Sequence, residues 1–283
     1  MLGRLGNNLF QYALGRVLAE KHGVPLLMDA SWFNNQGWGQ VNCLKRLPGP
    51  AAGTVKIVRR CSLGARALLK ATGKHYWEYR GVPVLRESEA DQSFQPGFMD
   101  APNDCMLFGY FQTPLYFTGM EKSLRSELDT SALGLEQGRE ALSDRLRATG
   151  SVAVHVRRSD YAGNPNLDLC GVNYYRSAME QMRTSNPKAR FFVFSDEPGW
   201  AAANLPGPDI EHVAHRANQS PLVDLHLMSL ARHHIIANSS YSWWAAWLGK
   251  KAEQQVLMPS HWFGSIHAPI AEKRLSHWSI VSP

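Results

Sequence analysis

The sequence predicts an α/β fold in which a parallel sheet is covered by helices on both faces. Short runs of β-branched and aromatic residues alternate with segments of helical periodicity along the second half of the chain. Polar residues directly follow several of these runs, as they do where ligands bind at the carboxyl ends of parallel strands. The 283 residues, 44% hydrophobic and 19% charged, are enough for one or two globular domains.

The second half of the chain is the more regular. Its expected strands are residues 152–156, 189–194, 211–213, 234–237 and 255–259. Its expected helices are residues 174–182, 200–205, 222–232 and 238–248. Because strands and helices alternate, we expect the strands to be parallel.

The first half is less regular. A helix is expected after Gly3 and Gly6, ending near His22 and Gly23, and the β-α-β pattern calls for a strand before Gly3 that this chain does not contain. The other expected elements are strands at residues 24–29 and 106–112 and helical segments at 114–128 and 133–146. Gly150 marks a boundary between domains 1–149 and 150–283, with the last residues able to pack back on the first domain.

Charge and cysteine content restrict the partners. The net charge of +6 and the pI of about 9.2 favour anionic partners, and a phosphorylated small molecule fits as well as nucleic acid. The four cysteines are far apart in sequence, so we interpret them as free thiols of a reducing compartment. No apolar run reaches the roughly 18 residues that span a bilayer, and no signal peptide is recognisable. These features predict a cytoplasmic protein, with peripheral contact to the inner face of the membrane left open.

One segment supports a different class of function. Residues 54–73 have the pattern of an amphipathic basic helix, with basic positions at Lys56, Arg59, Arg60, Arg66 and Lys70. Such a helix is the basis for an alternative in which the chain is a non-catalytic module that binds nucleic acid or a membrane surface. A solvated helix face is the simpler interpretation.

The strand expected at 152–156 is followed at once by Arg157 and Arg158. Because guanidinium groups stay ionised and present planar, forked donors, we expect this pair to bind anions such as carboxylates or phosphates. Asp160 can hold one arginine and leave the other for a ligand. The alternative is an Arg–Asp pair that only fixes a loop, and these residues alone favour neither.

Polar side chains also follow two other expected strands. Ser195 and Asp196 follow one, and residues 238–242, Asn-Ser-Ser-Tyr-Ser, open a helix after another. Together with the arginines they would converge at one edge of the sheet, where hydroxyl groups and free helix N–H groups suit a pyrophosphate. Each feature alone is more often structural, because Ser and Asn are ordinary helix caps.

No motif for a metal or a common nucleotide cofactor is present. The sequence contains no P-loop, no dinucleotide fingerprint and no Asp-x-Asp pair for a divalent cation. The histidine pairs at 212/215 and 233/234 lack a third ligand at zinc spacing. We therefore expect no metal centre, with arginines and helix dipoles stabilising a leaving diphosphate instead.

Five stretches resemble, in order, motifs of the α-1,2-fucosyltransferases of glycosyltransferase family 11. They are residues 3–13, 109–117, 155–161, 194–198 and 238–244. The central one is His155-x-Arg157-Arg158-x-Asp160-Tyr161, and Asn8 stands where the family more usually has Gln. The resemblance implies a GT-B-like enzyme of two Rossmann-like domains whose parallel sheets face each other across a cleft.

The activity that the resemblance implies is transfer of L-fucose from GDP-fucose to the 2-hydroxyl of a galactoside, with inversion and without a metal or other cofactor. Its partners would be GDP-fucose and a galactose-containing glycan rather than nucleic acid, and the oligomeric state is left undefined. A related transferase that uses a different GDP-sugar or acceptor linkage is the alternative.

The resemblance also implies roles for individual residues. Arg157 and Arg158 would grip the diphosphate, His155 would contact the nucleoside, and Asp224 would accept hydrogen bonds from the guanine edge. The other expected contacts to the donor come from Asn238, Ser239, Ser240 and Ser242 and, across the cleft, from Gly3, Gly6 and Asn7. Asp160 and Asp196 are the candidate general bases, unless Asp160 only orients Arg157 and the leaving phosphate takes the proton.

Overall fold

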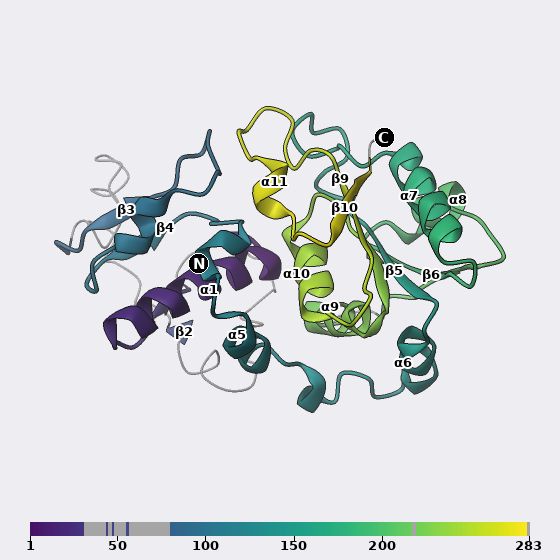
Figure 1. Cartoon of the computed structure of the whole chain (residues 1–283), viewed down its shortest axis with the longest axis horizontal. Coiled ribbons are helices and arrows are strands. Elements are labelled where there is room, and N and C mark those ends of the chain that lie inside the picture. The colour runs from purple at the N-terminus through teal and green to yellow at the C-terminus, as the bar shows by residue number, and fades with distance from the viewer. Residues whose placement is uncertain (31–43, 45–46, 48–54, 57–79, 217–218, 282–283) are drawn as a thin grey trace. The chain divides into compact units, whose positions relative to one another are not determined.

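The computed structural model describes residues 1–30, 44, 47, 55–56, 80–216 and 219–281. Their contacts divide the chain into two compact units, Met1–Leu128 and Asp129–Pro283. Figure 1 labels many of the elements of both units. The sequence-based boundary at 149/150 lies after helix α6 (Glu140–Arg147), which the contacts group with the second unit because it packs on α9 and β5.

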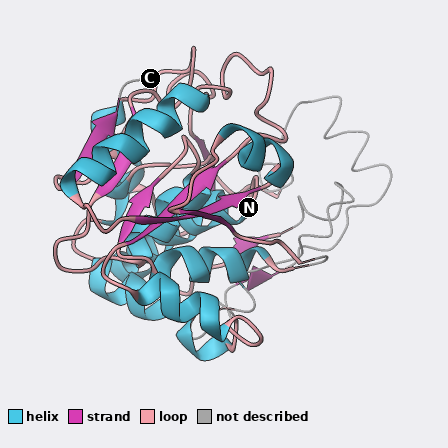
Figure 2. Cartoon of the chain, turned by 90° about the vertical axis from the view of Figure 1, so that its right-hand side faces the viewer, coloured by secondary structure: helices cyan, strands magenta, loops and turns pink. Residues whose placement is uncertain are grey.

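The second unit is built on a six-stranded sheet of order β10-β9-β8-β5-β6-β7, in which every neighbouring pair is parallel (Figures 1 and 2). Its strands are β5 (Ser151–Val156), β6 (Arg190–Ser195), β7 (Ile210–His212), β8 (His233–Ile235), β9 (Val256–Pro259) and β10 (Trp278–Val281). Besides α6, its described helices are the 3-10 helix η5 (Ser131–Leu133) and the α-helices α7 (Val172–Ser185), α8 (Pro198–Asn204), α9 (Pro221–Leu230), α10 (Ser240–Leu248) and α11 (Ile270–Lys273).

Strand β5 is buried along its whole length in the middle of this sheet. Val152, Val154 and Val156 belong to a core cluster with Tyr175 and Met179 of α7. Side chains alternate between the two faces of a strand, and the ring of His155, which points the other way, lies 5.5 Å from that of Tyr241 in α10. The predicted parallel sheet with helices on both faces is therefore confirmed for this unit.

The first unit is organised around α1 (Leu5–His22), which ends at Gly23 in the left-handed conformation, as predicted. Its strands form two parallel pairs, β1 (Met28–Asp29) with β2 (Val55–Lys56) and β3 (Val84–Arg86) with β4 (Met106–Phe108). The other helices among its described residues are the 3-10 helices η3 (Pro96–Asp100) and η4 (Pro114–Phe117) and the α-helix α5 (Glu121–Glu127). Arg16 and Tyr12 of α1 both bind the carboxylate of Glu127, which ties α1 to α5.

Several expected elements are shorter than predicted or were not expected. The strand predicted at 24–29 is only Met28–Asp29, and that predicted at 106–112 ends at Phe108. The helix predicted from 133 begins at Glu140, and β3, β10 and α11 were not predicted. Of the basic segment 54–73 only Val55–Lys56 is described, as strand β2, so the predicted helix lies outside the described residues.

Two further findings concern the described part of the chain. None of its helices is both long and apolar enough to cross a bilayer. Its cysteines, Cys105 and Cys170, are free thiols, and Cys43 and Cys61 lie outside it.

Candidate active site

The two arginines leave the carboxyl end of β5, between its neighbours β6 and β8. Because the three strands are parallel, the residues that follow them meet at the same edge of the sheet. Arg157 and Arg158 follow β5, Asp196 follows β6, and Asn238 lies three residues beyond the end of β8. We call the charged side chains Arg157, Arg158, Asp160, Asp196 and Glu197 the strand-end cluster.

Arg157 is held by two carboxylates. Its Nη1 lies 2.6 Å from Oδ2 of Asp196, and its Nη2 donates to Oδ1 of Asp160. The guanidinium also stands over the ring of Tyr161, 5.4 Å from its centroid. The side chain is only 13% exposed, whereas that of Asp160 is 44% exposed. Two donor groups of the Arg157 guanidinium are therefore each bound to a carboxylate.

Arg158 points to a different set of partners. Its Nε donates to Oε2 of Glu197 at 3.2 Å, and its guanidinium lies 4.2 Å from the ring centroid of Trp200 in α8. Asp168 is at 4.0 Å. The two adjacent arginines thus separate, with Arg157 toward Asp160 and Asp196 and Arg158 toward the start of α8.

Asp196 organises the turn that carries both arginines. Its Oδ1 accepts from the backbone N–H of Arg158 at 2.9 Å, and its Oδ2 accepts from the hydroxyl of Ser159 at 2.7 Å. Burial raises the pKa of Asp196, but the charge of Arg157 and these hydrogen bonds outweigh it, so the net pKa is below the usual value. Asp196 is therefore an ionised anchor at neutral pH.

His155, two residues before Arg157 in β5, is buried. Burial, reinforced by the charge of Arg157, lowers its pKa to about 4, so the ring is neutral at pH 7. Its Nδ1 has no hydrogen-bond partner among the described residues. The adjacent Tyr241 donates to the carbonyl of Pro221 at 2.5 Å, which links this side of the sheet to the first turn of α9.

The polar residues at the start of α10 are mostly engaged with the protein. Asn238 donates to the carbonyls of Leu167 and Trp262, at 3.0 and 3.1 Å, and Ser242 donates to the carbonyl of Ser239 at 3.2 Å. Ser239 and Ser242 are buried, while Ser240, the first residue of the helix, is partly exposed. Ser240 is therefore the least buried of the three serines.

Asp224 lies in the first turn of α9, where helix N–H groups favour an acid. Its Oδ2 is 3.0 Å from Nδ1 of His215, and its Oδ1 accepts from Nε2 of Gln219 at 2.5 Å. Burial raises its pKa, although His215, Arg139 and Gln219 act in the opposite direction.

The predicted residues of the amino-terminal motif belong to the first unit. Gly3 has a φ of +70°, and a Cβ there would collide with the side chain of Asn7. Gly6 and Asn7 lie in the first turn of α1 rather than in a loop, and Oδ1 of Asn7 accepts from Nε2 of Gln112 at 3.0 Å. Of the two expected loop glycines, only Gly3 forms the turn.

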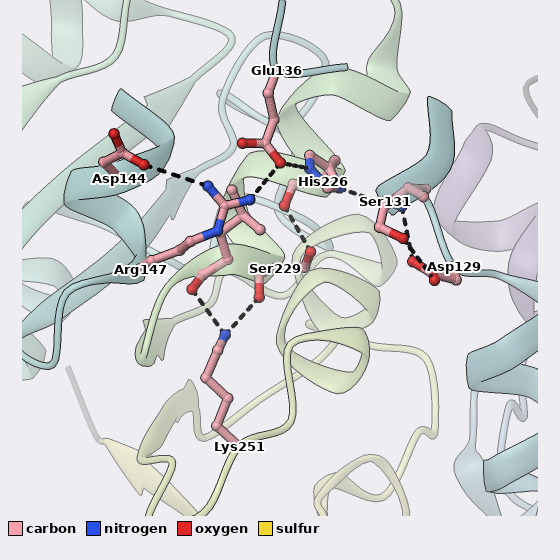
Figure 3. Close-up of polar contacts among 10 residues, drawn as sticks. Asp129, Ser131, Glu136, Asp144, Arg147, His226, Ser229 and Lys251 are labelled. Carbon is pink, nitrogen blue, oxygen red and sulfur yellow. Dashed lines mark hydrogen bonds and ion pairs between the residues drawn. The ribbon is translucent and has the colours of Figure 1, made fainter. Parts of the chain in front are cut away.

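A second group of charged residues surrounds α9 (Figure 3). We call Thr130, Glu136, Arg147, His226 and Lys251 the α9 cluster. His226 is buried between Glu136, at 2.9 Å, and Thr130, at 2.8 Å, and Glu136 also accepts from Arg147 at 2.6 Å. Lys251 donates to three carbonyls, those of Ser229, Leu230 and Ala231, each at 2.9 Å.

Sequence reasoning missed Glu197, Trp200 and Gln219. The sequence places Glu197 only within the motif 194–198 and Trp200 only at the start of a predicted helix, although their proximity to the end of β6 is a usable signal. Gln219 carries no signal of its own. Among the described residues no group of three or more His, Cys, Asp or Glu side chains is arranged to hold a metal ion.

Comparison with known proteins places this geometry in a family. The family model of glycosyl transferase family 11 matches residues 90–274, which include the whole strand-end cluster. The chain belongs to glycosyltransferase family 11. The earlier resemblance is thereby confirmed.

Curated relatives and solved structures agree with this assignment. An alpha-1,2-colitosyltransferase of Escherichia coli is 28% identical over 273 residues, covering 93% of this chain and 91% of the relative. Galactoside alpha-(1,2)-fucosyltransferase 1 of Plecturocebus brunneus is 29% identical over 155 residues, covering 50% of this chain and 42% of that protein.

The fold is GT-B-like. The crystal structure of the fucosyltransferase NodZ from Bradyrhizobium superposes with a TM-score of 0.53, at 14% identity, over 86% of this chain and 89% of that one. The chain is therefore a family 11 glycosyltransferase related to the α-1,2-fucosyltransferases.

Proposed function

We propose that this family 11 enzyme transfers L-fucose from GDP-fucose to the 2-hydroxyl of a galactoside, with inversion and without a metal ion. The observation that carries the proposal is the position of Arg157 at the carboxyl end of β5, with its forked donors turned toward two carboxylates. A diphosphate offers the same charge and a matching pair of oxygens. The names of the fucosyltransferase relatives supply the sugar and the linkage.

The diphosphate of the donor would replace Asp160 on Arg157. Asp160 is the more exposed of the two acids, with 44% of its side chain exposed against 22% for Asp196, and Asp196 is fixed by two further hydrogen bonds. As the bond between C1 and oxygen breaks, negative charge grows on the β-phosphate, and Arg157 stabilises it more strongly than in the ground state. Arg158 and the start of α10, with Ser239 and Ser240, contribute further positive potential and donors.

Inversion constrains the general base. In an in-line displacement the acceptor hydroxyl attacks from the face of the sugar opposite the leaving phosphate. Asp160 and Asp196 are both bound to Arg157, so we assign them to the leaving-group side, where they orient the arginine. The proton of the acceptor is then taken by a group from elsewhere in the protein, because the leaving phosphate lies on the opposite face of the sugar.

A second donor sugar is favoured by one specific observation. One of the relatives that match nearly the whole chain is named a colitosyltransferase. Colitose lacks the 3-hydroxyl that fucose carries, so the two donors differ at a position remote from the diphosphate. Transfer assays with GDP-fucose, GDP-colitose and GDP-mannose decide between them, since the preferred donor is that with the highest kcat/KM.

The proposed function is tested by ligand-induced stabilisation. A ligand at one hundred times its Kd stabilises the folded state by about 2.7 kcal/mol. We expect GDP to raise the thermal midpoint, UDP and CMP to leave it unchanged, and Mg²⁺ to make no difference to the GDP effect. Equal stabilisation by UDP, or a GDP effect seen only with Mg²⁺, would contradict the proposal.

A further inference from the structure

The segment that precedes α9 fixes the orientation of the Asp224 carboxylate. Both donors, Nδ1 of His215 and Nε2 of Gln219, come from the connection between β7 and α9, and each binds a different oxygen. A carboxylate oxygen has two lone pairs, so each oxygen keeps one for a further donor. The side chain of Asp224 is 18% exposed, so it is not closed off from solvent.

Gln219 is itself held by a residue from another element. Arg139, the N-cap residue of α6, donates through Nη2 to Oε1 of Gln219 and, at 3.0 Å, to the carbonyl of Ala214. Arginine can only donate, so the oxygen of the Gln219 amide must face Arg139. The NH₂ group then faces Asp224, so the two hydrogen-bond partners fix the orientation of the amide.

This arrangement suits a base with two adjacent donors. The Watson–Crick edge of guanine presents N1–H and the 2-amino group side by side, whereas adenine presents one donor and one acceptor there. A carboxylate whose plane is fixed accepts both guanine donors and repels the lone pair of adenine N1. Such discrimination depends on the carboxylate being ionised and correctly turned, which is what the donors from His215 and Gln219 promote.

We propose that Gln219, oriented by Arg139, is a positioning residue that sets the carboxylate of Asp224 for the guanine base and thereby contributes to the selection of a guanine nucleotide. This inference rests on the proposed function, in which Asp224 receives the base. It adds to that function a residue whose effect passes through Asp224 and not through direct contact with the donor.

The test compares two substitutions at one position. Gln219→Ala removes both hydrogen bonds, whereas Gln219→Glu keeps an oxygen for Arg139 and replaces the donor to Asp224 with a like charge. If Gln219 only anchored the loop through Arg139, Gln219→Glu would bind nucleotide as the wild type does. If it positions Asp224, Gln219→Glu loses at least as much affinity as Gln219→Ala.

The measurement is calorimetric binding of GDP and of inosine diphosphate, which lacks the 2-amino group. Loss of one hydrogen bond to a charged group corresponds to about a tenfold change or more, so we expect the wild type to bind GDP about tenfold more tightly than inosine diphosphate. In Gln219→Glu this ratio should fall toward one while the thermal midpoint without ligand stays within about 2 °C of the wild type, as for a surface change.

Arg145→Ala is the matched control. Arg145 lies in α6, the helix that Arg139 caps, but its guanidinium pairs with Glu211 at 2.7 Å. We expect it to keep the wild-type ratio. If Gln219→Glu keeps both the affinity and the ratio, the positioning role is wrong while the proposed function stands. If the wild type does not bind GDP, the proposed function fails and this inference fails with it.

Discussion

Arg157 and Lys251, two cations of the second unit, are held by different kinds of partner. In the strand-end cluster, the partners of Arg157 are the side chains of Asp160 and Asp196. In the α9 cluster, Lys251 donates to consecutive carbonyls at the end of α9, and His226 has a partner on each ring nitrogen (Figure 3). A carboxylate side chain can turn away when a stronger anion arrives, but the carbonyls of a helix end cannot. A partly buried cation therefore indicates a binding site only where its partners are replaceable.

The largest expected effect follows from Arg157→Ala. Without the guanidinium, the charge that develops on the leaving phosphate has lost its main partner, so kcat should fall by about 10²- to 10³-fold and GDP should no longer be retained. The fold should persist, because Asp196 keeps its bonds to Ser159 and to the backbone of Arg158. Steady-state transfer and GDP calorimetry measure the two effects.

Arg147→Ala provides the comparison in the α9 cluster, where the arginine binds Glu136. It should leave transfer per folded molecule unchanged. Wild-type turnover in Arg157→Ala would overturn the assignment of the site.

The next largest effect is expected at Lys251. Lys251→Met keeps most of the apolar stem and removes the ammonium, so three carbonyls at the end of α9 lose their donor. Loss of such partners destabilises the folded state by about 1–3 kcal/mol. Urea unfolding should show a lower midpoint, with kcat/KM for the remaining folded protein unchanged. A variant of normal stability but low activity would mean that the α9 cluster takes part in the reaction.

Asp160→Asn tests whether the partner of Arg157 is replaceable. Removing the competing anion should tighten GDP binding by up to about fivefold, since a partly exposed ion pair contributes about 1 kcal/mol at most. Turnover should change by less than tenfold. A loss of about 10²-fold or more in kcat would instead identify Asp160 as the general base.

Asp196→Asn is the matched variant and should weaken GDP binding. Its carboxylate organises the turn of Arg158 and Ser159 besides pairing with Arg157. If both substitutions had the same effect on GDP affinity, the distinction between a replaceable and an anchoring acid would be lost.

The strands of the second unit were predictable because burial and β-branching coincide in them. Other boundaries depended on the backbone. The helix predicted from residue 133 begins only at Glu140 because Gly134 and Gly138 adopt positive φ, 61° and 70°. The strand predicted to run to residue 112 stops at Phe108. Beyond it, the N–H groups of Tyr110 and Phe111 donate to the carboxylate of Glu87, so they do not pair with a neighbouring strand. Such competition is invisible to periodicity.

In the candidate site, too, some contacts could be predicted from the sequence and others could not. Arg157 and Asp196 could be brought together from sequence, because both directly follow neighbouring parallel strands. The turning of Arg158 toward Glu197 and Trp200 could not, since it depends on where α8 begins. The pairing of Gln219 with Asp224 depends on the path of a connecting segment, which no short motif encodes.

The smallest expected effect concerns pH and the α9 cluster. The hydrogen bond from Arg147 lowers the pKa of Glu136 to about 2, from a usual value of 4.5. A carboxyl with a depressed pKa contributes stability that is fully present above pH 4.5 and is lost as the pH falls toward 2.

Because the ion pair is partly exposed, the contribution should be below about 1 kcal/mol. Urea midpoints of the wild type and Glu136→Gln should therefore differ at pH 7 and converge only as the pH falls to about 2. Asp144→Asn, which removes an acid 3.9 Å from Arg147 with an 80% exposed side chain, should match the wild type throughout. A gap between wild type and Glu136→Gln that does not change with pH would show that the carboxylate charge contributes nothing and that the side chain acts only through its shape.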